Sequence, residues 1–139
     1  MRTRRAGFTL LELLVVVSVV LLFLAIAVPQ FNAFRLWLAF NAATEDAQQM
    51  IDRARWRAIN SGRPTRITIS SGTLQLRDDA TDSVLSTVSL TTNMVTASAT
   101  NFPVTFDTRG FVAGTTPTLR ITNARGDRTL TISPLGRTS

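Results

Sequence analysis

The feature that most constrains this chain is an acidic residue at the start of a long apolar run. Glu12 is followed directly by Leu13 to Val28, a run in which Ser18 is the one polar residue. The segment Phe8 to Val28 has 21 residues, about 30 Å as a helix, which matches the hydrocarbon thickness of a bilayer. A carboxylate at bilayer depth costs roughly 3 kcal/mol. The cost of placing Glu12 at this depth must therefore be offset by an interaction of its carboxylate or by its function.

The residues on either side of the run indicate how it would be oriented in a membrane. Arg2, Arg4 and Arg5 precede it, and basic flanks tend to stay in the cytoplasm, so we expect the C-terminal part outside the inner membrane. No small-residue cleavage site of the Ala-x-Ala kind follows the run, so it differs from an ordinary secretory signal. The pattern predicts a single-pass anchor that continues into further helix.

A second helical pattern follows the apolar run, with small and apolar residues at every third or fourth position. The members of this stripe are Ala33, Trp37, Phe40, Ala43, Ala47, Met50 or Ile51, Ala54 and Ala58. Pro29 lacks an amide hydrogen and crowds the preceding turn, which predicts a kink and not a full stop. Ser61, Gly62 and Pro64 end the pattern, and Gly62 suits a left-handed cap. We expect one helix from Phe8 to Asn60.

Beyond Gly62 the apolar period changes to two, which is the period of half-buried strands. The expected strands carry Ile67 and Ile69, Leu74 and Leu76, Val84 to Leu90, Val95 to Ala99, Val104 and Phe106, Leu119 and Ile121, and Leu130 and Ile132. Ser71-Gly72 and Asn123 to Asp127 indicate hairpin turns. A long helix followed by six or seven short strands is an α+β arrangement, and such strands gain stability by covering the helix.

The composition argues against an enzyme or a metal centre. The chain has no Cys and no His, so it lacks the usual zinc ligands and the commonest general base. It also has no Lys to activate its many Ser and Thr hydroxyls. Asp78, Asp79 and Asp82 lack the glycine and the distal glutamate of a calcium loop. We therefore expect no catalytic residue, no metal and no cofactor.

The N-terminus resembles the type III signal of the type IV pilin and pseudopilin superfamily. The resemblance rests on Arg4-Arg-Ala-Gly-Phe8, on Glu12 four residues later, on the apolar run and on Pro29 just past it. It implies cleavage between Gly7 and Phe8 by a prepilin peptidase and methylation of the Phe8 amino group. It also implies that Glu12 pairs with the methylated ammonium of a neighbouring subunit during assembly. Pairing two charges that are each costly in a low-dielectric core would explain why Glu12 is kept.

The same resemblance implies how the chain is organised. Residues 1–7 would be the leader, 8–29 the transmembrane and filament-core helix, 30–62 the amphipathic half of that helix, and 63–139 a β-rich domain. The implied fold is a long kinked helix packed on an antiparallel sheet. The implied location is the inner membrane and then the filament. The implied partners are other subunits, the prepilin peptidase, the inner-membrane assembly platform and, before assembly, lipid.

The last third of the chain looks like the domain shared by the H-type pseudopilins of type II secretion and the T-type minor pilins. This second resemblance rests on Phe106-Asp-Thr-Arg-Gly110, Leu119-Arg-Ile121, Gly126, Leu130-Thr-Ile132 and Gly136-Arg137. A major pseudopilin would be expected to carry acidic calcium ligands in a C-terminal loop, yet only Asp127 lies beyond Asp107. The pattern favours a minor subunit near the filament tip, with a major pilin as an alternative. It does not separate type IV pili from type II secretion.

Clusters of arginine add a DNA-binding minor pilin for natural transformation as a further alternative, because guanidinium groups fork onto phosphates. The candidate contacts are Arg53, Arg57, Arg63 and Arg66 near the helix end, and Arg125, Arg128 and Arg137 near the C-terminus. Cations at a helix C-terminus also interact favourably with the helix dipole. Without the three leader arginines, twelve remain against nine carboxylates, so DNA is not favoured. Trp56 is expected in the core or at an interface.

Overall fold

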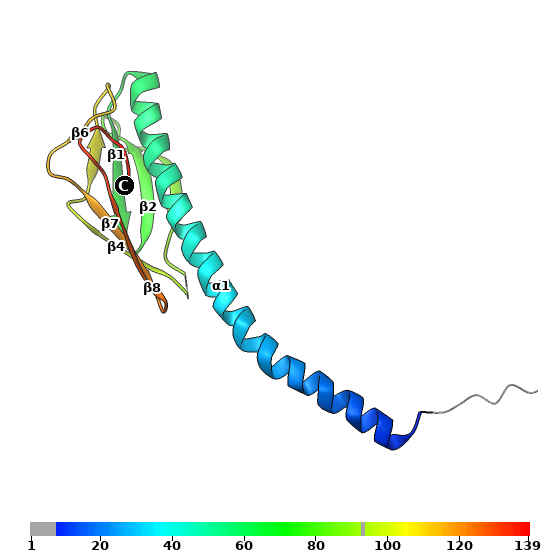
Figure 1. Cartoon of the computed structure of the whole chain (residues 1–139). Coiled ribbons are helices and arrows are strands. Elements are labelled where there is room, and N and C mark those ends of the chain that lie inside the picture. Colours follow the sequence, from blue (N-terminus) through cyan, green and yellow to red (C-terminus); the bar gives the residue numbers. More distant parts are fainter. Residues whose placement is uncertain (1–7, 93) are drawn as a thin grey trace, which may run out of the picture. The chain divides into compact units, whose positions relative to one another are not determined.

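The computed structural model describes residues 8–92 and 94–139, so Gly7 and the rest of the leader lie outside the described residues. One helix, α1 (Leu10–Ser61), is followed by short strands, as Figure 1 shows. The expected helix, Phe8 to Asn60, is confirmed to within two residues at each end. Contacts divide the chain into two compact units, Met1–Arg35 and Leu36–Ser139.

In the first unit, the side chains of α1 up to Asn32 are not covered by any other part of the described chain. Every side chain from Phe8 to Asn32 is exposed, and the helix is long and apolar enough to cross a membrane. The Ser18 hydroxyl donates to the Leu14 carbonyl at 2.8 Å, which satisfies the polar group inside the run. Pro29 lies within α1 and does not end it. The kink expected there stays a prediction.

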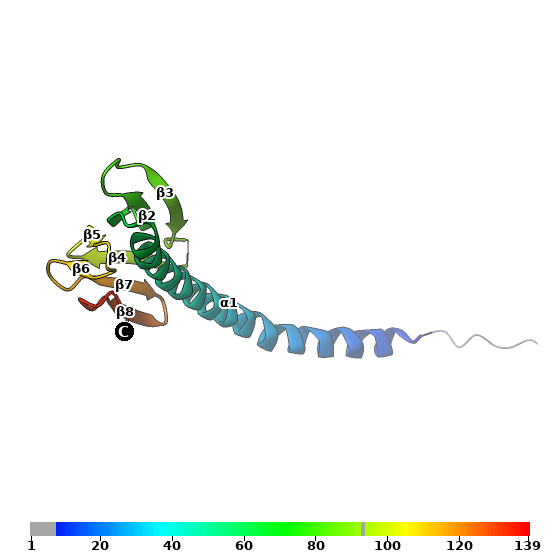
Figure 2. The same ribbon diagram turned by 90° about the horizontal axis from the view of Figure 1, so that it is seen from above.

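The second unit contains two antiparallel sheets. Their strands are β1 (Thr65–Ser70), β2 (Thr73–Asp78), β3 (Val84–Ser89), β4 (Thr96–Thr100), β5 (Val104–Phe106), β6 (Val112–Ala113), β7 (Thr118–Asn123) and β8 (Gly126–Thr131). The larger sheet has the order β3-β2-β1-β5-β6, and the smaller has the order β4-β7-β8. All seven expected strands are present, whereas the two-residue β6 was not expected. Figure 2 shows the strands gathered around the C-terminal part of α1.

The turns follow the sequence predictions. Ser71 and Gly72 join β1 to β2 with φ angles of 49° and 73°, the left-handed pair that a tight hairpin requires. Asn123 pairs with Gly126 across the turn between β7 and β8. Gly62 follows α1 with a φ of 61°, which confirms the predicted left-handed cap.

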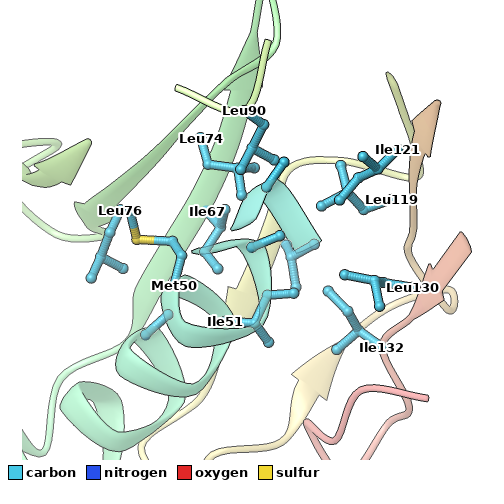
Figure 3. Packing of buried hydrophobic residues seen from close by; sticks show 14 of the residues in the cluster. Met50, Ile51, Ile67, Leu74, Leu76, Leu90, Leu119, Ile121, Leu130 and Ile132 are labelled. Carbon is cyan, nitrogen blue, oxygen red and sulfur yellow. The ribbon is translucent and has the colours of Figure 1, made fainter. Parts of the chain in front are cut away.

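The core lies between the second half of α1 and both sheets. Met50 lies on the side of Ile67 and Leu76, while Ile51 lies on the side of Leu130 and Ile132, as Figure 3 shows. The remaining buried residues of the helix are small, so Met50 and Ile51 supply its large buried side chains. These residues are Ala43, Thr44, Ala47, Ala54 and Ala58.

The expected stripe is therefore buried only from Ala43 onward. Its first large member, Trp37, keeps 51% of its surface exposed, so its placement on the packed face was wrong. Helical spacing shows which residues share a face, but it does not show where the sheet stops covering that face. Thr44 is buried although the stripe omits it, because its hydroxyl donates to the Phe40 carbonyl at 2.8 Å and so brings no unsatisfied group into the core.

Candidate functional site

The N-terminal end of α1 combines a carboxylate with an apolar surface. Glu12 lies in the first helical turn, where the helix dipole favours a negative charge. Its amide donates to the Thr9 hydroxyl at 3.2 Å, which caps the helix. From Leu13 to Phe34 the sequence holds no further charge. An exposed apolar surface of this extent calls for lipid or another protein to cover it.

At the other end of α1, the loop from Asp107 to Phe111 is closed by the carboxylate of Asp107. Asp107 Oδ1 accepts hydrogen bonds from the amides of Arg109 and Phe111, each at 2.9 Å. These bonds, the one from Phe111 above all, and the nearby Arg109 guanidinium lower the pKa of Asp107. The aspartate therefore shapes this loop, which leads into β6.

Two glycines named in the second resemblance, Gly110 and Gly136, lie where the chain packs closely on α1. Gly110 and Gly136 are both buried, and a Cβ atom on either would lie within 3.1 Å of the Arg55 side chain. The two segments are also joined by a hydrogen bond from the Val112 amide to the Pro134 carbonyl at 3.0 Å. Glycine is needed at both positions because backbone and helix side chain meet without room for a methyl group.

The surface beside these glycines is a groove of about 440 Å³ lined by Asp52, Arg53, Arg55, Trp56 and Ile59. Trp56 is 66% exposed, so of the two places expected for it the core is wrong, whereas the interface stays a prediction. Arg55 Nε is buried without a hydrogen-bond partner among the described residues. The groove therefore combines two apolar side chains, Trp56 and Ile59, with two arginines and one carboxylate.

The first arginine cluster is partly neutralised. Arg66 lies 2.6 Å from Asp82 and 3.4 Å from Asp79, and Arg53 donates to the Ser86 hydroxyl at 3.3 Å. Arg57 and Arg63 are exposed. The acidic turn pairs with arginines, since Asp82 also contacts Arg77 at 3.0 Å. The cluster therefore offers less positive charge than its sequence indicates.

The second arginine group is divided between two ends of β8. Arg125 lies in the turn before β8, whereas Arg137 lies in a turn after it, held by a hydrogen bond from the Ser133 amide to the Arg137 carbonyl at 2.8 Å. Six residues of strand span about 20 Å, so the structure does not bring these two side chains together. Arg128 lies on β8 itself, with its guanidinium carbon 5.5 Å from the centre of the Phe40 ring.

Sequence reasoning missed the contact between this hairpin and the helix. Asn123 Nδ2 donates to the Leu36 carbonyl at 3.2 Å, across 87 positions of the sequence. Beside this bond lies a groove of about 390 Å³ lined by Trp37, Phe40 and the hairpin turn. The amphipathic stripe placed Trp37 and Phe40 on one face, but no local signal shows which strand turn meets them.

Two family models match the sequence. The model described as Type II transport protein GspH matches residues 43–136, which include the core half of α1 and almost all of the β-domain. The prokaryotic N-terminal methylation motif matches residues 2–28. The two matches fall on the two regions that carry the resemblances described above. No curated protein matches the chain significantly.

Solved structures share this fold. The type IV minor pilin FimU of Pseudomonas aeruginosa is 23% identical, with 72% of this chain and 86% of that chain covered and a TM-score of 0.62. A second crystal form of FimU is 25% identical, covering 71% and 90%, with a TM-score of 0.60. The minor pseudopilin EpsH from the Type 2 Secretion System of Vibrio cholerae is 13% identical, covering 72% and 94%, with a TM-score of 0.61.

Proposed function

Because the chain belongs to the family of the Type II transport protein GspH, we propose that it is a minor subunit near the tip of a type IV pilus or type II secretion pseudopilus. The chain is minor-pilin-like or minor-pseudopilin-like in sequence family and in fold. The alternative of a major pilin has no support from these matches. The family is one of structural filament subunits, and we extend to this chain the absence of catalytic activity.

One observation carries this proposal, and it is the exposed apolar helix. Side chains from Phe8 to Asn32 are all exposed, while the same helix is packed on strands from Ala43 onward. Water is a poor solvent for such a surface. A bilayer covers it in the precursor, and the helices of neighbouring subunits cover it in the filament.

The proposed life of the subunit follows from this helix. The leader, residues 1–7, stays cytoplasmic with its arginines, the prepilin peptidase cuts between Gly7 and Phe8, and the new amino group of Phe8 is methylated. Residues 8–29 span the inner membrane, and residues 30–62 and 63–139 lie outside it. The assembly platform then moves the subunit into the filament, where Glu12 pairs with the ammonium of a neighbour.

The test is to produce the full chain with its assembly machinery and to follow its mass and location. The membrane form should have lost seven residues and gained one methyl group, and it should appear in filaments sheared from the cells. Gly7→Leu should leave uncut precursor in the membrane, whereas the matched control Gly114→Leu should be cut normally. An uncut native N-terminus would refute the processing step. A cut chain that never enters filaments would refute the subunit role.

A further inference from the structure

The turn between β7 and β8 is attached to the first residue of the second compact unit. Asn123 uses its side-chain amide for this attachment, with Nδ2 donating to the Leu36 carbonyl at 3.2 Å. Its Oδ1 accepts from the Arg125 amide at 2.9 Å, which holds the turn in shape. The hairpin turn therefore lies at the level of Leu36, next to the end of the domain that continues into the apolar helix.

This attachment limits how far the turn can lie from a bilayer that holds the anchor. Leu36 comes eight residues after Val28, the end of the apolar run, which is about 12 Å along a helix. The headgroup layer on each side of the hydrocarbon is roughly 5–8 Å thick. Along the chain, the residue that holds the turn therefore follows the apolar run by a length of helix comparable with the thickness of the headgroup layer. This step rests on the membrane anchorage in the proposed function.

The surface at this level has the side chains that a headgroup layer favours. Trp37 is 51% exposed and lines the groove of about 390 Å³ together with Phe40 and Arg125. The guanidinium carbon of Arg128 lies 5.5 Å from the centre of the Phe40 ring, and Arg128 is exposed. The one carboxylate of the turn, Asp127, is paired with Arg120 at 3.0 Å. The surface therefore combines aromatic rings with an excess of positive charge.

We propose that the membrane-proximal surface, defined as Trp37, Phe40, Arg125 and Arg128, binds anionic phospholipid headgroups while the precursor is anchored. The indole lies at the interface, where its ring is half in apolar surroundings. The guanidinium groups contact lipid phosphates. The β-domain is then held against the bilayer before assembly, and this contact is given up when the subunit enters the filament.

The absence of Cys allows a single thiol to report the position of the turn. Ala124→Cys, labelled with a nitroxide, places the probe in the turn itself. Asn60→Cys is the matched control, because it is exposed and lies about 36 Å along α1 from Leu36. The full chain is reconstituted at high dilution in vesicles of phosphatidylcholine alone or with phosphatidylglycerol. Collision with a water-soluble nickel complex and with oxygen measures how deeply each probe lies.

In phosphatidylglycerol vesicles the Ala124 probe should be shielded from the nickel complex, and the Asn60 probe should not. Two arginines near an anionic surface shift the ratio of lipid-bound to free domain by roughly 30-fold. Arg125→Gln with Arg128→Gln should abolish the shielding, while Arg53→Gln with Arg57→Gln should preserve it. Salt at about 1 M, where the Debye length is about 3 Å, should also abolish it.

Three results would overturn the inference. The first is equal accessibility of the Ala124 probe in both kinds of vesicle. The second is equal loss of shielding in the two double variants. The third is shielding that requires dense protein, which would assign the surface to a second copy of the chain. Resistance of the chain to alkaline extraction tests the anchor separately: a chain that is not anchored contradicts the proposed function, whereas an anchored chain with an exposed turn contradicts this inference alone.

Discussion

A Cβ atom on Gly136 would lie 2.6 Å from the carbonyl oxygen of Gly110. These residues come from the loop after β5 and from the C-terminal turn, and both pack on the Arg55 side chain. Their contact packs two loops of the β-domain on the C-terminal part of α1. It supplies a physical reason for the glycines that mark this part of the sequence.

Gly136→Ala should therefore destabilise the domain strongly. The methyl group would meet backbone, which cannot move aside, and its φ of 70° is left-handed. We expect a loss of about 2–3 kcal/mol in the free energy of unfolding, measured by urea unfolding of the full chain in detergent. The control is Gly62→Ala, with a similar φ of 61° and no atom within 4 Å of the new methyl. Equal losses in the two variants would contradict the proposed close approach.

Thr65→Val should weaken the connection between α1 and β1. Thr65 is 1% exposed, and its hydroxyl donates to the Ala54 carbonyl at 2.9 Å. Removing this buried bond while keeping the shape should cost about 1 kcal/mol in unfolding free energy. Thr44→Val is the matched control, since its hydroxyl bonds within its own helix and should matter less. A larger loss for Thr44→Val in urea unfolding would show that the Thr65 bond has no special role.

Asp107→Asn should change how stability depends on pH. The pKa of Asp107 is lowered in the folded chain, first by the Phe111 amide and also by Arg109. A lowered folded pKa means that the ionised carboxylate stabilises the fold above the ordinary value of 3.8, and that this contribution disappears as the pH falls through the lower folded pKa. The wild-type advantage over Asp107→Asn should be constant near neutral pH and shrink below that value. Unfolding curves measured across this range test it, and an advantage that grew on acidification would contradict it.

Glu12→Ala should reduce assembly without affecting the domain. The carboxylate is remote from the packed half of α1, which begins at Ala43, so cleavage, insertion and folding should be normal. Incorporation into sheared filaments should fall because the neighbour's ammonium loses its partner. Glu45→Ala, a change at an exposed position on the same helix, is the control. Normal incorporation of the Glu12 variant, measured by quantitative immunoblot, would remove the pairing role.

DNA binding by the β-domain should be weak and independent of sequence. Arg66 is paired with two carboxylates, and Arg125 and Arg137 lie beyond opposite ends of β8. Any binding to phosphates should weaken with salt, with a log–log slope of about −0.9 for each phosphate neutralised. Fluorescence anisotropy of labelled duplex with residues 36–139 measures this. Tight, salt-sensitive binding that is lost in Arg57→Ala with Arg63→Ala, or in Arg125→Ala with Arg128→Ala, would favour the DNA-binding alternative.

Much of the fold was predictable because its signals are local. The start and end of α1 follow from the apolar run and from Gly62, and the β1–β2 hairpin follows from Ser71-Gly72 between two alternating segments. The short β6 was missed because a two-residue strand is too short for a period. It forms because Val112 pairs with Phe106 on β5, and this pairing depends on the loop closed by Asp107.

By itself, the sequence determined the apolar run, the position of Glu12, the single long helix and the order of most strands, since each depends on residue type and spacing over a few turns or one hairpin. Only the tertiary structure decided where the packed face of α1 begins, which arginines are neutralised, and that Gly110 meets Gly136. It also decided that Asn123 bonds to Leu36. These features join segments far apart in the chain. Periodicity describes one element at a time, whereas such contacts arise only when two sheets and a helix share one core.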